Sequence, residues 1–200
     1  MKLYFSPGAC SLSPHIALRE AALPFELEQV DLKEKRTKSG ADFRAINPKG
    51  YVPALALDNG ELLTEGPAIL QYLADRVPEK KLAPPAGSFE RVRLQETLNF
   101  VTSELHKGLG SLFNPKNPDA WREVVKSILA TRFAIVEKTL ESKPYIMGAF
   151  SVADCYLFTI LNWTKFLKLD LSPWPALPAY LGRMAERPAV QAALKAEGIG

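Results

Sequence analysis

The chain has little cysteine and no long apolar run. Its 200 residues contain two cysteines, Cys10 and Cys155, which lie far apart in the sequence. This spacing provides neither a zinc motif nor a disulfide framework, so we expect no metal site and two free thiols in a reducing compartment. No apolar stretch is long enough to cross a bilayer, and residues 1–5 are expected to form a strand rather than a signal peptide. A cytoplasmic protein with no membrane partner is therefore expected.

The chain also lacks a strong excess of either charge. Its formal net charge is +3, and the basic residues form only short clusters, such as Lys33 to Lys38. Nucleic-acid binding is not indicated by this distribution. With 47% hydrophobic residues, the chain has enough apolar side chains to form the core of one large or two small domains.

The first third of the chain alternates between strand and helix patterns. The predicted elements are a strand at 2–6, a helix at 14–22, a strand at 25–30, a weak helix at 41–45, strands at 54–57 and 62–63, and a helix at 67–76. Asp58-Asn59-Gly60 separates the last two strands and has the composition of a hairpin turn. This order predicts an α/β domain over residues 1–78, built as βαβ followed by ββα.

The remainder of the chain has helical patterns only. Residues 79–88 contain Pro84-Pro85 and predict a linker, and residues 89–200 predict an all-α domain. The expected helices cover 89–112, 118–140, 151–166, 175–186 and 188–197, with Asn117 as the N-cap of the second and a capping box from Ser151 to Asp154 in the third. The residues expected to form a buried stripe on the second helix are Leu129, Phe133, Val136 and Leu140.

Two short motifs indicate a site for a small charged peptide. In Tyr51-Val52-Pro53, the valine precedes a proline and is therefore extended, which makes its N–H and C=O available to a peptide backbone. Glu65 and Gly66 lie at the start of a predicted helix, where an acid and a backbone N–H suit the ammonium and carboxylate of an amino acid. Taken singly, each motif is also compatible with an ordinary loop or helix start.

Cys10 lies directly after the first predicted strand and before the first helix. At such a position, backbone N–H groups and the helix dipole stabilise a thiolate. The alternative for an isolated cysteine is a buried structural residue, which is our expectation for Cys155. No second cysteine follows in Cys10-Ser11-Leu12-Ser13, so a local disulfide cannot form.

Together, these motifs resemble the cytosolic glutathione transferases, most closely the bacterial beta class. The segments that carry the resemblance are residues 2–11, Asn47-Pro48-Lys49-Gly50-Tyr51-Val52-Pro53-Ala54-Leu55, residues 63–69, Glu104-Leu105-His106-Lys107 and Ser151-Val152-Ala153-Asp154. The resemblance covers nearly the whole chain. It implies a thioredoxin-like first domain, a helical second domain that contributes the electrophile pocket, and a homodimer.

The resemblance also implies residue roles in the first domain. Glutathione is expected as a co-substrate, with no prosthetic group. Cys10 is expected beside the glutathione sulfur, and Ser11 is an alternative hydrogen-bond donor to the thiolate. Val52, joined to Pro53 by a cis bond, is expected to bind the cysteinyl backbone. The γ-glutamyl end is assigned to Glu65 and Gly66, and the glycyl carboxylate to Lys35. Many relatives have serine at the position of Gly66, so one hydroxyl contact is expected to be missing.

In the second domain, His106 is expected to act as a proton donor or acceptor near the thiol, and Lys107 to lower the thiol pKa. Asn99 is expected to orient this group, while Ser103 and Glu104 reach the ligand of a partner subunit. The candidate walls of the electrophile pocket are Phe5, Leu109, Phe113, Trp163 and Phe166.

The predicted function is conjugation of glutathione to soft hydrophobic electrophiles in detoxification, with thiol-disulfide exchange through Cys10. Two alternatives remain open: a noncatalytic glutathione-binding scaffold, or a specialised glutathione-dependent isomerase or dehalogenase.

Overall fold

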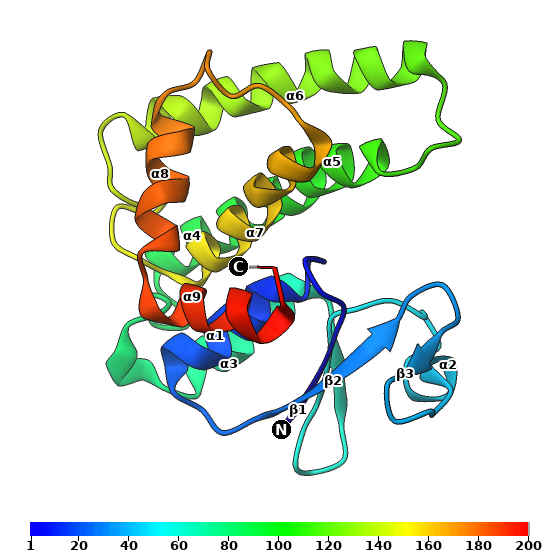
Figure 1. Ribbon diagram of the computed structural model, residues 1–200. Helices are drawn as coiled ribbons and strands as arrows, with labels where there is room; N and C mark the ends of the chain where they lie inside the picture. Colours follow the sequence, from blue (N-terminus) through cyan, green and yellow to red (C-terminus); the bar gives the residue numbers. More distant parts are fainter. Residues whose placement is uncertain (200) are drawn as a thin grey trace. The chain divides into compact units, whose positions relative to one another are not determined.

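The computed structural model describes residues 1–199 and divides into two compact units. The first unit comprises Met1–Leu82 and the C-terminal segment that begins at Arg187, and the second comprises Ala83–Glu186. Figure 1 shows the course of the chain through both units.

The first unit contains a mixed five-stranded sheet in the order β3-β2-β1-β4-β5. The strands are β1 (Lys2–Phe5), β2 (Glu26–Asp31), β3 (Arg36–Thr37), β4 (Ala54–Ala56) and β5 (Leu62–Thr64). β1 pairs parallel with β2 and antiparallel with β4. β1 alternates buried and partly exposed residues, with Leu3 and Phe5 in the core. The predicted βαβ and ββα order is confirmed, and Gly60, at φ 89°, lies in the turn between β4 and β5.

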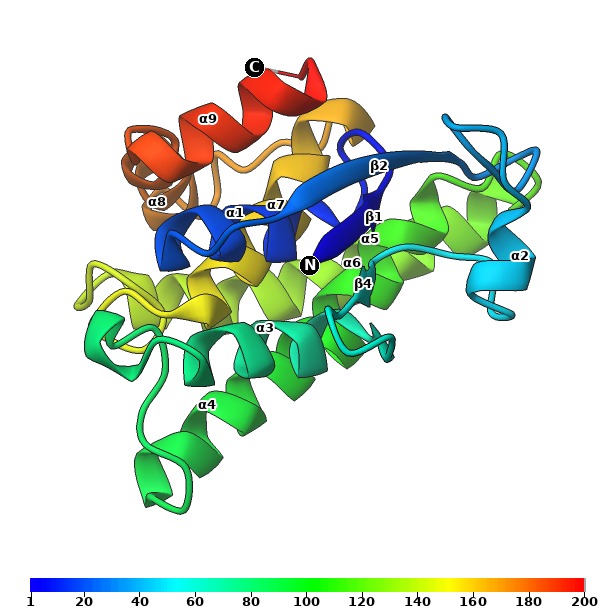
Figure 2. The ribbon, with the colours of Figure 1, turned by 90° about the horizontal axis from the view of Figure 1, so that it is seen from below.

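Helices α1 (Leu12–Ala21), α2 (Phe43–Ile46) and α3 (Gly66–Asp75), and the short helix η1 (Pro78–Lys80), complete the N-terminal part of this unit. Pro67 suits the first turn of α3 because that turn leaves backbone N–H groups unpaired in any case. The buried face of α3 is formed by Ile69, Leu70 and Leu73. Helix α9 (Pro188–Glu197) lies beside α1, as Figures 1 and 2 show.

The second unit is entirely helical in its regular structure. Its elements are α4 (Phe89–Phe100), η2 (Val101–His106), α5 (Lys107–Leu112), α6 (Asp119–Leu140), α7 (Val152–Leu167) and α8 (Ala176–Ala185). Thirteen consecutive residues of α7, from Val152 to Thr164, are buried, so this helix forms the centre of the unit. The predicted stripe of α6 is buried, and the capping box of Ser151 and Asp154 is present at the start of α7.

The structure differs from the sequence prediction in four places. Helix α9 belongs to the first unit, not to the second domain predicted over 89–200, because it packs on α1. Strand β3 is an addition to the prediction, because two residues are too few to give a strand pattern in the sequence. Residues 101–106 form a π-helical turn inside the predicted helix 89–112. Asn117 is not an N-cap: its amide donates to the Ser111 carbonyl (2.8 Å), and Pro118 precedes the helix.

No helix within residues 1–199 is long and apolar enough to cross a membrane.

Candidate functional site

Cys10 lies in the turn that connects β1 to α1. The turn is closed by the Ala9 N–H donating to Ser6 O and the Leu12 N–H donating to Ala9 O, each at 3.0 Å. The Cys10 side chain is partly buried, and its Sγ donates to the Val52 carbonyl oxygen at 3.3 Å. The Val52–Pro53 bond is cis, as predicted. The first unit therefore brings the thiol and the extended Val-Pro segment together.

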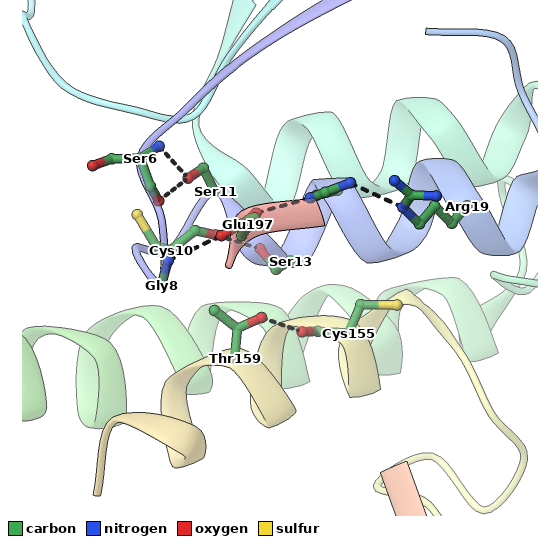
Figure 3. Close-up of polar contacts among 10 residues, drawn as sticks. Ser6, Gly8, Cys10, Ser11, Ser13, Arg19, Cys155, Thr159 and Glu197 are labelled. Carbon is green, nitrogen blue, oxygen red and sulfur yellow. Dashed lines mark hydrogen bonds and ion pairs between the residues drawn. The ribbon is translucent and has the colours of Figure 1, made fainter. Parts of the chain in front are cut away.

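Ser11 bonds to the backbone of its own turn. It is fully buried, and its Oγ accepts from the Ser6 N–H (3.1 Å) and donates to the Ser6 carbonyl (3.3 Å). Figure 3 shows both bonds closing the loop around Cys10. With its hydroxyl engaged in this way, Ser11 shapes the turn that carries the cysteine.

The C-terminal helix anchors the same turn. Glu197 of α9 accepts a hydrogen bond from the Gly8 N–H at 2.9 Å (Figure 3). Its other carboxylate oxygen lies 2.8 Å from His15 Nδ1. Arg19 Nε donates to His15 Nε2 at 2.9 Å, so Nε2 is the accepting nitrogen and Nδ1 carries the proton given to Glu197. The side chains of His15 and Glu197 are fully buried. Through this network, α1 and α9 fix the start of the cysteine turn.

Glu65 and Gly66 occupy the start of α3, as predicted. Glu65 has φ +68° and ψ 113°, a backbone conformation that is rare for residues other than glycine and that clusters at functional sites. Its carbonyl accepts from the N–H groups of Ala68 and Ile69. Its carboxylate pairs with Lys49, Nζ to Oε1 at 2.5 Å. Pro67 has no N–H, so in the first two positions of α3 only Gly66 offers a backbone donor.

Lys35 supports the loop that leads to Val52. Its Nζ donates to the Gly50 carbonyl at 2.7 Å. Gly50 has φ +67°, and a Cβ there would approach the Arg44 and Lys35 side chains at 3.6 and 3.7 Å. Glycine is therefore favoured at this position by its backbone conformation. The structure gives Lys35 a loop contact, and its role toward a ligand remains a prediction.

In the second unit, Asn99, Ser103 and Glu104 lie along α4 and η2. The Ser103 hydroxyl donates to the Asn99 carbonyl (3.1 Å) and approaches Glu104 Oε1 at 3.4 Å. The other carboxylate oxygen of Glu104 pairs with Arg132 Nε of α6 at 2.6 Å. Hydrogen bonds of Ser103 thus connect these three predicted residues, and Arg132 fixes the carboxylate of Glu104.

His106 lies in an aromatic cluster of the second unit. Its Nδ1 is 2.6 Å from the hydroxyl oxygen of Tyr156, and the centroid of its ring is 5.0 Å from the centroid of the Trp163 ring. The Trp163 ring is in turn 5.5 Å from that of Phe113, which is half exposed. Leu109 is buried and Phe166 is exposed, while Phe5 belongs to the core of the first unit. Lys107, next to His106, is exposed.

Sequence reasoning missed the partners of the predicted residues. These partners are Lys49, Arg132 and Tyr156, and the buried pair of His15 and Glu197 beside the cysteine turn was also missed. Of these residues, Lys49 could have been found from the sequence, because it lies inside the recognised motif Asn47-Pro48-Lys49-Gly50. The others are paired across 28 to 182 residues of sequence, and no local pattern indicates such pairs. Within residues 1–199, no three His, Cys, Asp or Glu side chains are grouped in a way that suits a metal ion.

This fold and this cysteine turn define a thioredoxin-like domain joined to a helical domain. Residues 8–76 match the family model "Glutathione S-transferase, N-terminal domain", and residues 100–188 match "Glutathione S-transferase, C-terminal domain". The chain therefore belongs to the glutathione S-transferase family.

Relatives over the full length agree. The chain is 48% identical over 200 residues to glutathione S-transferase GstA of Escherichia coli O157:H7, covering 100% of both chains. It is also similar to the solved structure of a sphingomonad glutathione S-transferase complexed with glutathione (TM-score 0.96, 49% identity) and to a bacterial beta-class glutathione S-transferase of Sphingomonas chungbukensis (TM-score 0.96, 48% identity), in each case over 100% of both chains. The chain is thus a glutathione transferase with bacterial beta-class relatives, and the predicted fold class is confirmed.

Proposed function

We propose that this transferase conjugates the thiol of glutathione to soft hydrophobic electrophiles and also exchanges thiols and disulfides through Cys10. The observation that carries the proposal is the Cys10 thiol at 3.3 Å from the carbonyl oxygen of Val52, the residue proposed to pair with the cysteinyl backbone. The Ser11 hydroxyl is engaged with Ser6, which favours Cys10 over Ser11 as the group beside the glutathione sulfur.

In this proposal, Val52 binds the cysteinyl backbone, Glu65 and Gly66 bind the γ-glutamyl end, and Lys35 binds the glycyl carboxylate. Conjugation requires the glutathione thiol to lose its proton and the sulfur to attack the electrophile. His106 is proposed to assist the proton transfer, and Lys107 to favour thiolates. Asn99 orients this group. Ser103 and Glu104 are proposed to contact glutathione of the partner subunit in a cytoplasmic homodimer.

Thiol-disulfide exchange would proceed in two balanced steps. The Cys10 thiolate attacks one sulfur of glutathione disulfide, which forms a Cys10–glutathione disulfide and releases one glutathione thiolate. A second thiolate then attacks the glutathione sulfur of this mixed disulfide, which releases a new disulfide and regenerates the Cys10 thiolate. This cycle requires only one thiol of the protein, which the cysteine turn supplies as Cys10.

The test measures conjugation to chlorodinitrobenzene and mass after incubation with glutathione disulfide. We expect the wild type to turn over chlorodinitrobenzene. We also expect it to gain the mass of one glutathione, and Cys10→Ala to show no such mass gain. Cys155→Ala is the matched control and should retain the added mass, because Cys155 is fully buried. Modification at Cys155, or an unchanged mass gain in Cys10→Ala, would refute the exchange activity. Absence of turnover in a protein that still binds glutathione would refute conjugation to this class of electrophile and favour an isomerase or dehalogenase.

A further inference from the structure

Lys49 and Glu65 form an ion pair that the motif-based assignment of glutathione contacts does not include. Lys49 lies in the loop that leads to Val52, and Glu65 lies at the start of α3. Lys49 Nζ is 2.5 Å from Glu65 Oε1 and 3.0 Å from the Thr64 hydroxyl. The hydrogen bond with Glu65 raises the pKa of Lys49, which keeps the amine protonated.

Each member of the pair retains bonding capacity. An ammonium has three N–H donors, and Lys49 uses two of them, toward Thr64 and Glu65. A carboxylate accepts through two oxygens, and in the described part of the chain Glu65 Oε2 receives no side-chain or backbone donor. One cationic donor and one anionic acceptor thus lie next to each other. An α-amino acid end has the complementary groups, an ammonium and a carboxylate on one carbon.

The backbone holds both residues in place. Asn47 is buried, and its side chain bridges the loop: Nδ2 donates to the Tyr51 carbonyl at 2.8 Å, and Oδ1 accepts from the Lys49 N–H at 3.2 Å. Glu65 is held in its positive-φ conformation at the first turn of α3. The two side chains are nevertheless 44% and 57% exposed, so a ligand can reach them. A preorganised, accessible pair is suited to recognition.

We propose that Lys49 binds the α-carboxylate of the γ-glutamyl residue of glutathione, together with the Gly66 N–H, while Glu65 binds the ammonium. Lys49 is then a specificity-determining residue for ligands that end in an amino acid zwitterion. This inference rests on the proposed function, because it assumes that glutathione binds with its γ-glutamyl end at Glu65. It adds a second charge to a subsite that the sequence assigned to Glu65 and Gly66.

The experiment is isothermal titration of three ligands that differ only at this end. Glutathione has both charges, 4-aminobutyryl-cysteinylglycine lacks the α-carboxylate, and glutaryl-cysteinylglycine lacks the ammonium. For Lys49→Met we expect about a tenfold rise in Kd for glutathione and for the glutaryl ligand, the effect of losing one charge-assisted hydrogen bond. Affinity for the 4-aminobutyryl ligand should not change. Lys49→Arg, which keeps the charge, should restore most of the loss.

The control is Lys80→Met, which removes the same charge from an exposed lysine of the same unit. It should bind all three ligands as the wild type does. An equal loss of affinity for all three ligands in Lys49→Met would mean that Lys49 only positions the Glu65 side chain, and it would overturn the inference. Tighter binding of the 4-aminobutyryl ligand would show that Lys49 competes for Glu65, which also overturns it. A wild type that binds none of the ligands would instead refute the proposed function.

Discussion

Replacing Glu197 by alanine should destabilise the first unit and loosen the cysteine turn. The substitution leaves two donors without their acceptor, the Gly8 N–H and His15 Nδ1–H, of which the His15 side chain is fully buried. An unsatisfied buried donor costs about 1–3 kcal/mol, so the loss of the His15 contact alone is about 2 kcal/mol. For a chain of this length, that corresponds to a fall in Tm of about 6 °C.

Two measurements check this expectation. Differential scanning calorimetry gives the fall in Tm, and hydrogen exchange reports the Gly8 amide directly. In the wild type the Gly8 N–H is bonded to Glu197, so its exchange should be slowed, and Glu197→Ala should abolish that protection. Glu197→Gln keeps the size and one accepting oxygen, and its Tm should lie between the two.

Lys195→Ala is the matched control, because Lys195 is an exposed residue of the same helix. Its Tm should remain close to that of the wild type. If Glu197→Ala has the same Tm as Lys195→Ala and the Gly8 amide remains protected from exchange, the buried network does not anchor the turn, and the reasoning fails.

Two further predictions concern the second unit. Burial raises the pKa of Asp154 from 3.8 to about 6, so the folded state holds this proton more tightly and loses stability as the pH rises from about 4 to 6. Asp154→Asn lacks this titration, and in urea unfolding its stability relative to the wild type should rise by about 3 kcal/mol over that range; a constant difference would contradict this. Gly108→Ala should cost about 1–3 kcal/mol in urea unfolding, because its Cβ would lie 2.9 Å from Leu129 Cδ2. Gly182→Ala, with no atom within 4 Å, should gain about 0.5–1 kcal/mol, and equal effects of the two would rule out the steric explanation.

Much of the local structure could be predicted from neighbouring residues. The hairpin at Asp58-Asn59-Gly60 and the capping box of Ser151 and Asp154 form where their short motifs occur. The cysteine turn and the start of α3 at Gly66 also follow from adjacent residues, since turns and caps are closed by bonds between residues that are close in sequence. These turns and helix starts could therefore be predicted from the sequence, although the bonding partners of their side chains could not.

The sequence by itself determined the order of the elements, the family, and the positions of Cys10, Val52 and Glu65, because these depend on periodicity and short motifs. Only the tertiary structure decided which side chains distant in the sequence contact one another. His106 meets Tyr156 50 positions away, and His15 meets Glu197 182 positions away. Such pairs form because packing brings distant helices together, and the burial of α9 against α1 removes that helix from the domain its position in the sequence suggests.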